Sequence, residues 1–154
     1  MKILALDLGA TTGFALIEEG KALSWGEKTF PGDRPQRFRA FRRWLVAYLL
    51  ANRPDTVIYE RPFCRGLHAT RSLWGMAGIV EEAVVDYAAC LDIVPTTLKK
   101  WATGSGKASK QDMIFIAVRF VHPPQSGPWP EMGEHEADAI ILGLYAAENI
   151  EPGE

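Results

Sequence analysis

The chain has 154 residues, of which 47% are hydrophobic and 23% are charged, and its formal net charge is −2. The composition is that of a globular protein, and the length suits one domain and is too short for two. We therefore predict a single domain over residues 1–150 and a short tail over residues 151–154. No apolar run approaches the ~20 residues of a membrane span, and the N-terminal run is too short for a signal-peptide core. We therefore expect a cytoplasmic protein with no membrane partner.

The first part of the chain has the pattern of an antiparallel meander. Residues 2–7 are mostly apolar and end in an Asp-Leu-Gly turn, which predicts a buried strand. Residues 13–17 and 22–30 predict two further strands, joined by a tight turn at Glu19, Gly20 and Lys21. Three antiparallel strands are therefore expected to come first.

Helices and strands alternate in the middle of the chain. Apolar residues recur at helical spacing over residues 35–51, and the β-branched and aromatic run at residues 56–60 predicts a strand. Residues 69–90 are expected to be mostly helical, and residues 91–94 to form a short strand.

Three helices are expected in the last third of the chain. Thr96 is the predicted N-cap of a short helix that ends at Trp101, and residues 109–120 predict a second helix. An irregular loop with four prolines, residues 122–130, precedes a final helix over residues 134–149. The whole order predicts an α/β fold in which a mixed five-stranded sheet is flanked by helices.

Acidic side chains stand at the ends of two predicted strands and on the last helix. Asp7 ends the first strand and Glu60 ends the fourth, so their carboxylates converge if the two strands are neighbours. His135 and Asp138 share one face of the last helix because they are three residues apart, and Glu134 could share it. Each residue alone also has a structural explanation, such as a braced turn or a packed histidine.

A cluster of like charges points to bound cations. Carboxylates that are packed together repel and raise one another's pKa, so such a cluster is tolerable chiefly when cations neutralise it. Oxygen-rich sites suit Mg²⁺ or Mn²⁺, and one imidazole moves the preference slightly toward Mn²⁺. Two ions ~4 Å apart can activate a water and stabilise the leaving oxygen of a phosphodiester.

Basic residues are segregated from these acids along the sequence. They gather in three segments: Arg34, Arg37, Arg39, Arg42 and Arg43; Arg61, Arg65 and Arg71; Lys99, Lys100, Lys107 and Lys110. The net charge of −2 argues against a nucleic-acid binder, since many such domains are basic, but this segregation permits a positive face beside a negative pocket. Solvated surface charge is the alternative explanation for any one segment.

The sequence resembles the RuvC family of Holliday junction resolvases, particularly its small phage-type members. The matching stretches follow the family's order and cover residues 3–13, 57–60, 95–99, 104–110 and 134–139. The resemblance implies an RNase H-like fold and a homodimer whose interface is the helix that starts near Ala69. It also implies two symmetric nicks across a four-way junction or other branched DNA, with two Mg²⁺ or Mn²⁺ ions per active site.

The resemblance further implies roles for individual residues. The family's metal-binding positions, which are also catalytic, fall on Asp7, Glu60, His135 and Asp138. Lys99 and Lys110 match lysines near the scissile phosphate, and Lys110 is expected to be catalytic. Together with the basic segments, the resemblance gives a set of expected DNA contacts: Lys99, Lys107, Lys110, Arg61, Phe63, Arg65 and Arg71.

Three other functions stay open at this point. Residues 7–13 also resemble the phosphate loop of the sugar-kinase and actin class, although that class clamps ATP between two lobes and this chain has the length of one. A non-catalytic DNA-binding or scaffold module would use the basic segments and leave the acids structural. A related RNase H-like nuclease could act on RNA–DNA hybrids or on other branched DNA.

Overall fold

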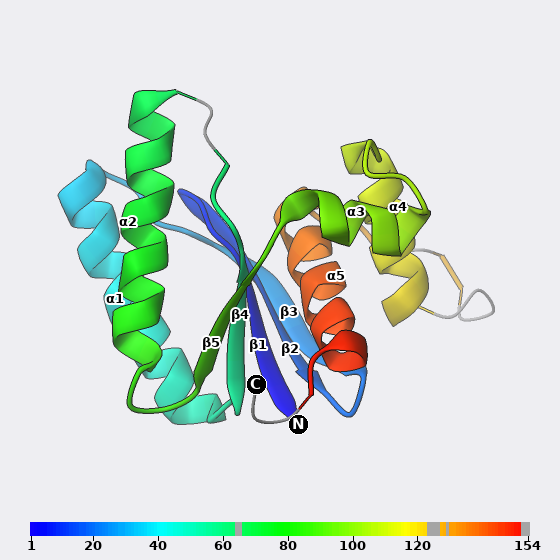
Figure 1. The fold of residues 1–154 in the computed structure, drawn as a ribbon, viewed down its shortest axis with the longest axis horizontal. Coiled ribbons are helices and arrows are strands. Elements are labelled where there is room, and N and C mark those ends of the chain that lie inside the picture. Colours follow the sequence, from blue (N-terminus) through cyan, green and yellow to red (C-terminus); the bar gives the residue numbers. More distant parts are fainter. Residues whose placement is uncertain (64–65, 123–126, 129, 152–154) are drawn as a thin grey trace.

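The computed structural model describes residues 1–63, 66–122, 127–128 and 130–151 (Figure 1). In chain order the elements are β1 (Lys2–Asp7), β2 (Thr11–Glu18), β3 (Lys21–Thr29), α1 (Arg34–Asn52), β4 (Thr56–Glu60), α2 (Leu67–Val84), β5 (Ala89–Ile93), α3 (Pro95–Thr103), α4 (Lys110–Val121) and α5 (Glu134–Asn149). No helix in these ranges is long and apolar enough to cross a membrane.

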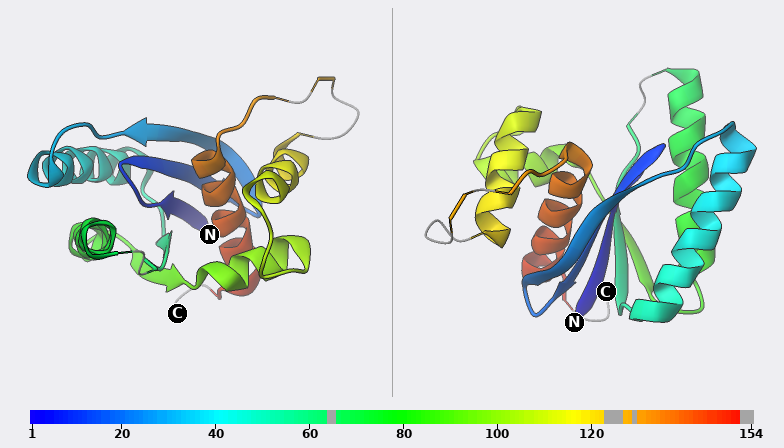
Figure 2. Two further views of the ribbon diagram at one scale, coloured as in Figure 1. Left: turned by 90° about the horizontal axis from the view of Figure 1, so that it is seen from above. Right: turned by 180° about the vertical axis from the view of Figure 1, so that it is seen from behind.

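The five strands form one mixed sheet in the order β3-β2-β1-β4-β5. The central strand, β1, pairs antiparallel with β2 and parallel with β4, and β4 pairs parallel with β5. The predicted sheet, with its three antiparallel strands first, is therefore confirmed. Helices α1 and α2 cover one face, and α5 covers the other with α3 and α4 beside it (Figures 1 and 2).

Alternation along β1 gives the molecule two cores, one on each side of the sheet. Ile3 and Ala5 belong to the cluster shared with α3, α4 and α5, whereas Leu4 and Leu6 belong to the cluster shared with α1 and α2. Successive strand residues point to opposite faces, and an apolar run can therefore fill both layers at once. This is why the first strand lacks the polar alternation of a half-exposed strand.

Several predicted boundaries differ from the observed ones, most of all around β5, and α3 ends at Thr103 where Trp101 was predicted. The helix expected over residues 69–90 ends at Val84, and β5 begins at Ala89. Ala89 and Cys90 pair with the start of β4, and this pairing overrides the helix propensity of alanine. The N-cap of α3 is Val94, and Thr96 lies inside the helix. Pro95 takes the first helical position, for which its fixed φ and missing N–H suit it.

Some predictions fall on residues outside the described ranges. Arg65 is one of them, as are residues 123–126 and 129 of the proline-containing loop and residues 152–154 of the expected tail. The turn at Glu19 and Gly20 is present and both residues have positive φ, which permits the tight reversal between β2 and β3.

Candidate active site

The two strand-end carboxylates lie side by side at one edge of the sheet. Leu6 of β1 is paired with Tyr59 of β4, and Asp7 and Glu60 follow them directly. Residues two positions before each acid, Ala5 and Ile58, face the cluster under α5. By the two-residue period of a strand, Asp7 and Glu60 also face α5.

Helix α5 brings the other predicted ligands to the same edge. It begins at Glu134, and His135 and Asp138 lie in and just after its first turn. The helix sits against β2 at Gly13, which is the register partner of Asp7. A Cβ at Gly13 would overlap the backbone carbonyl of His135, so only glycine permits this approach. The same contact covers Gly13 and speaks against residues 7–13 as a phosphate loop for ATP.

A cavity of about 550 Å³ collects most of the predicted site residues. Its lining comprises Asp7, Leu8, Glu60, Arg61, Pro62, Phe63, Ala69, Leu73, Val94, Pro95, Thr96, Lys99, Lys110, Met113 and Asp138. Three carboxylates and two lysines from five separate segments therefore face one space. The lysines can counter the charge of a phosphodiester directly, whereas the carboxylates could hold it only through a cation that lies between them.

His135 joins the cluster through Asp7. Its Nδ1 lies 2.6 Å from Oδ2 of Asp7, and this hydrogen bond raises the pKa of the imidazole. Burial raises the pKa of Asp7, while His135 counteracts part of that rise. The hydrogen bond to His135 thus holds the carboxylate of Asp7 in one orientation.

Asp138 is a second carboxyl group of the site whose pKa is raised. Burial, followed by the negative charge of Asp7, raises its pKa to about 7, and Lys99 acts in the opposite direction. Hydrogen bonding to Lys110 instead lowers the pKa of Glu134. A buried acid whose pKa is displaced by a second acid in a cavity is typical of a functional site.

The donor set fits a divalent cation, although the side chains do not form a ready-made cage. Among the described residues, no three His, Cys, Asp or Glu side chains are grouped closely enough to hold one ion together. Asp7, Glu60 and Asp138 nevertheless line one cavity and offer carboxylate oxygens, which are the ligands preferred by Mg²⁺ and Mn²⁺. A cation would also offset the cost of ionising Asp7 and Asp138 there.

The predicted DNA contacts divide by location. Lys99, Lys110, Arg61 and Phe63 line the cavity, and the Phe63 side chain is 68% exposed. Arg61 also forms a bidentate ion pair with Asp92, with N–O distances of 2.6 and 3.2 Å.

Two further predicted contacts lie outside this cavity. Lys107 lines a separate hollow between α3 and α4, and Arg71 is exposed on α2. Arg65 is outside the described residues.

Glu27 is a site neighbour that the sequence analysis did not identify. It lies on β3 in register with Gly13, and its carboxylate is packed against Gly133 at the start of α5. Its negative charge raises the pKa of both Asp7 and His135. The turn at residues 19–21 alone would pair Gly13 with Gly26, and a register shift between Leu16 and Ile17 brings Glu27 opposite Gly13 instead. The β2–β3 hairpin therefore gave a signal for the position of Glu27 only to within one residue.

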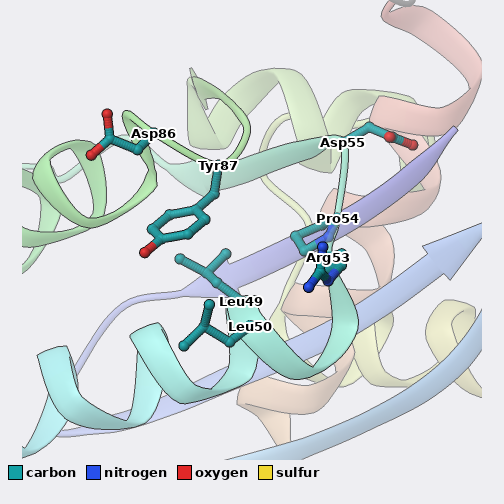
Figure 3. A pocket seen from close by; sticks show the side chains of 7 residues that line it. All are labelled: Leu49, Leu50, Arg53, Pro54, Asp55, Asp86 and Tyr87. Atoms are coloured by element: carbon teal, nitrogen blue, oxygen red, sulfur yellow. The ribbon is translucent and has the colours of Figure 1, made fainter.

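A second cavity, of about 510 Å³, lies at the opposite edge of the sheet (Figure 3). Its lining comprises Leu49, Leu50, Arg53, Pro54, Asp55, Asp86 and Tyr87. These residues precede β4 and β5, whereas the predicted site residues follow β1 and β4. None of the predicted site residues lines this second cavity.

Comparison with known proteins agrees with the motifs. No protein-family model matches the chain. The crossover junction endodeoxyribonuclease RuvC of Salinispora arenicola is 29% identical over 156 residues, which cover 94% of this chain and 86% of that protein. RuvC of Mycolicibacterium smegmatis is 29% identical over 161 residues, which cover 94% of this chain and 81% of that protein.

Solved structures show the same fold. Thermus thermophilus RuvC in complex with a Holliday junction substrate superposes with a TM-score of 0.78 and 22% identity, covering 96% of this chain and 93% of that one. The Fowlpox virus resolvase, in complex with Holliday junction DNA, superposes with a TM-score of 0.67 and 16% identity. The superposition covers 97% of this chain and 99% of that one. The expected RNase H-like fold is confirmed, and the narrower likeness to phage-type members stays a prediction.

Proposed function

Because this chain is related to the RuvC family, we propose that it is a metal-dependent endonuclease that resolves Holliday junctions by paired symmetric nicks. The observation that supports this most directly is the single cavity that Asp7, Glu60 and Asp138 share with Lys99 and Lys110. The relatives named above are crossover junction endodeoxyribonucleases, which cut the same class of DNA. Residues 1–150 would act as one nuclease domain, at work in the cytoplasm of a bacterial cell or a phage-infected host.

The chain's own residues suit hydrolysis of a phosphodiester. Asp7, Glu60 and Asp138, with His135, would hold two Mg²⁺ or Mn²⁺ ions, which supply an activated water and stabilise the leaving oxygen. Asp7 is hydrogen-bonded to His135 and shares the cavity with the other two acids, so it is the residue we expect to be least replaceable. Lys110, and more weakly Lys99, would neutralise charge on the phosphate.

We further propose a homodimer formed through the exposed face of α2. Leu67 and Trp74 on this helix have 72% and 46% of their surface exposed, and Val85, its C-cap residue, has 73% exposed. Large apolar side chains at this exposure are typical of a surface that another protein covers. Two copies related by a two-fold axis would place two cavities on one four-way junction, which paired nicks require.

The test compares wild type with Asp7→Asn on a panel of four-way, three-way, flap and RNA–DNA hybrid substrates in Mn²⁺ and in Mg²⁺. We expect wild type to cut the four-way junction in two symmetric places. Asp7→Asn should bind the junction but not cut it, because the amide is a weak ligand for a cation. Full cutting by Asp7→Asn would refute the assignment of Asp7.

The same panel separates the alternatives. Preferential cutting of hybrids or flaps would assign the chain to another RNase H-like nuclease activity. Binding without any cutting by wild type, in either metal, would identify a non-catalytic DNA-binding module.

A further inference from the structure

Glu134 lies between the lysine at the cavity mouth and the Asp7–His135 pair. Its Oε2 is 2.7 Å from Nζ of Lys110, and its Oε1 is 3.6 Å from Nε2 of His135. Nδ1 of His135 is in turn 2.6 Å from Asp7. A continuous row of ionisable groups therefore runs from the first residue of α4 to the end of β1.

The backbone at both ends of the Lys110–Glu134 pair is fixed, whereas the pair itself is open to solvent. Ser109 and Asp112 form a capping box that anchors the start of α4. The start of α5 is anchored by the side chain of Glu136, which accepts a hydrogen bond from the backbone N–H of Gly133. The Lys110 side chain is 75% exposed and that of Glu134 is 37% exposed, so a phosphate can reach the ammonium.

We propose that Glu134 is a positioning residue that occupies the phosphate's place on Lys110 until a DNA strand enters the cavity. This inference rests on the proposed function. The carboxylate holds the ammonium at the cavity mouth, where Lys110 also lines the wall beside Asp138. A backbone phosphate also offers anionic oxygens to an ammonium, and the solvent-exposed side chain of Lys110 can rotate from Glu134 to the phosphate.

The exchange has a measurable signature in junction affinity. Leaving the ion pair with Glu134 costs part of what Lys110 gains on the phosphate, and replacing Glu134 by glutamine removes that cost. The variant should therefore bind the junction about two- to fivefold more tightly, the range that one exposed ion pair covers. The slope of log K against log salt should stay nearly unchanged, because it counts counterions released from DNA and Lys110 neutralises one phosphate in both proteins.

The experiment measures junction affinity in chelator, where no cutting occurs, over a range of salt concentrations. The variants are Glu134→Gln, Lys110→Ala and the double variant. Glu131→Gln is the matched control, because it removes one exposed charge from the same acidic segment. We expect Glu134→Gln to tighten binding only while Lys110 is present, and Lys110→Ala to lower the slope by about 0.9 with either residue at position 134. Effects that persist in the Lys110→Ala background, or that Glu131→Gln reproduces, would overturn the proposal.

Amine labelling followed by mass spectrometry tests the ion pair without DNA. Lys110 should react faster in Glu134→Gln than in wild type, while Lys107, measured in the same sample, should be unchanged. Equal reactivity of Lys110 in the two proteins would also overturn the proposal. If wild type binds no branched DNA at all, the proposed function fails, and the labelling result still decides whether Glu134 holds Lys110.

Discussion

Substituting Gly13 by alanine tests how the site is assembled and leaves every proposed ligand in the sequence. The new Cβ would overlap the backbone carbonyl and the Cβ of His135. The obstacle is the backbone of α5, which cannot rotate aside as a flexible side chain would. Helix α5 must therefore move away from β2, and it carries His135 and Asp138 with it.

The expected size of the effect follows from this geometry. Overpacking a well-packed core costs about 1–3 kcal/mol, and we expect about 2 kcal/mol because rigid backbone is displaced. For a chain of this length each kcal/mol lowers Tm by about 2–4 °C, which gives a drop of about 4–8 °C. A misplacement of ~1 Å near reacting groups can cost ~10²-fold in rate. We therefore expect single-turnover cutting to fall by about two orders of magnitude.

The assay combines thermal unfolding with single-turnover cutting of a synthetic junction. Gly106→Ala is the matched control, because a Cβ at Gly106 would make only ordinary contacts with Thr96, at 3.8 and 4.0 Å. This control should be as stable as wild type or slightly more stable, since alanine restricts the unfolded chain. Wild-type Tm and cutting rate in Gly13→Ala would refute the packing argument.

Three further predictions concern the remaining parts of the site. Because the pKa of Asp138 is raised to about 7 in the folded state, wild type should lose stability as pH rises from about 4 to 7. In chelator, Asp138→Asn should be more stable than wild type by about 1–3 kcal/mol at pH 8, and the two proteins should be equally stable at pH 4. Equal melting temperatures of the two proteins at both pH values would contradict the raised pKa of Asp138. Phe63→Ala should change the free energy of unfolding by no more than ~0.5 kcal/mol, because the Phe63 side chain is 68% exposed. The variant should still cut junctions more slowly, because Phe63 lines the cavity, and unchanged cutting would remove it from the DNA interface. Trp74→Glu should fold normally yet sediment as a monomer, and a persistent dimer would exclude the α2 face as the interface.

Sequence patterns predicted those parts of the site that depend on residues close together in the chain. Asp7 and Glu60 each end an apolar strand, and acids at the carboxyl ends of neighbouring parallel strands share one edge of a sheet. His135 and Asp138 are three residues apart in a helix, which fixes their common face. The strands were predicted for the same reason, because apolar and β-branched runs carry a local signal.

Contacts between distant segments were decided only by the tertiary structure. Lys110 lies at the cavity whereas Lys107, three residues earlier, lines another hollow, because the start of α4 turns the chain between them. The end of α2 and the partners of Arg61 and Glu134 likewise depend on strands and helices far away in sequence. The sequence by itself thus determined which chemical groups are present and on which elements they stand. The packing of α5 on the sheet decided which of these groups meet. The distance between α5 and β2 depends on the absence of a side chain at Gly13, and no local sequence pattern predicts that distance.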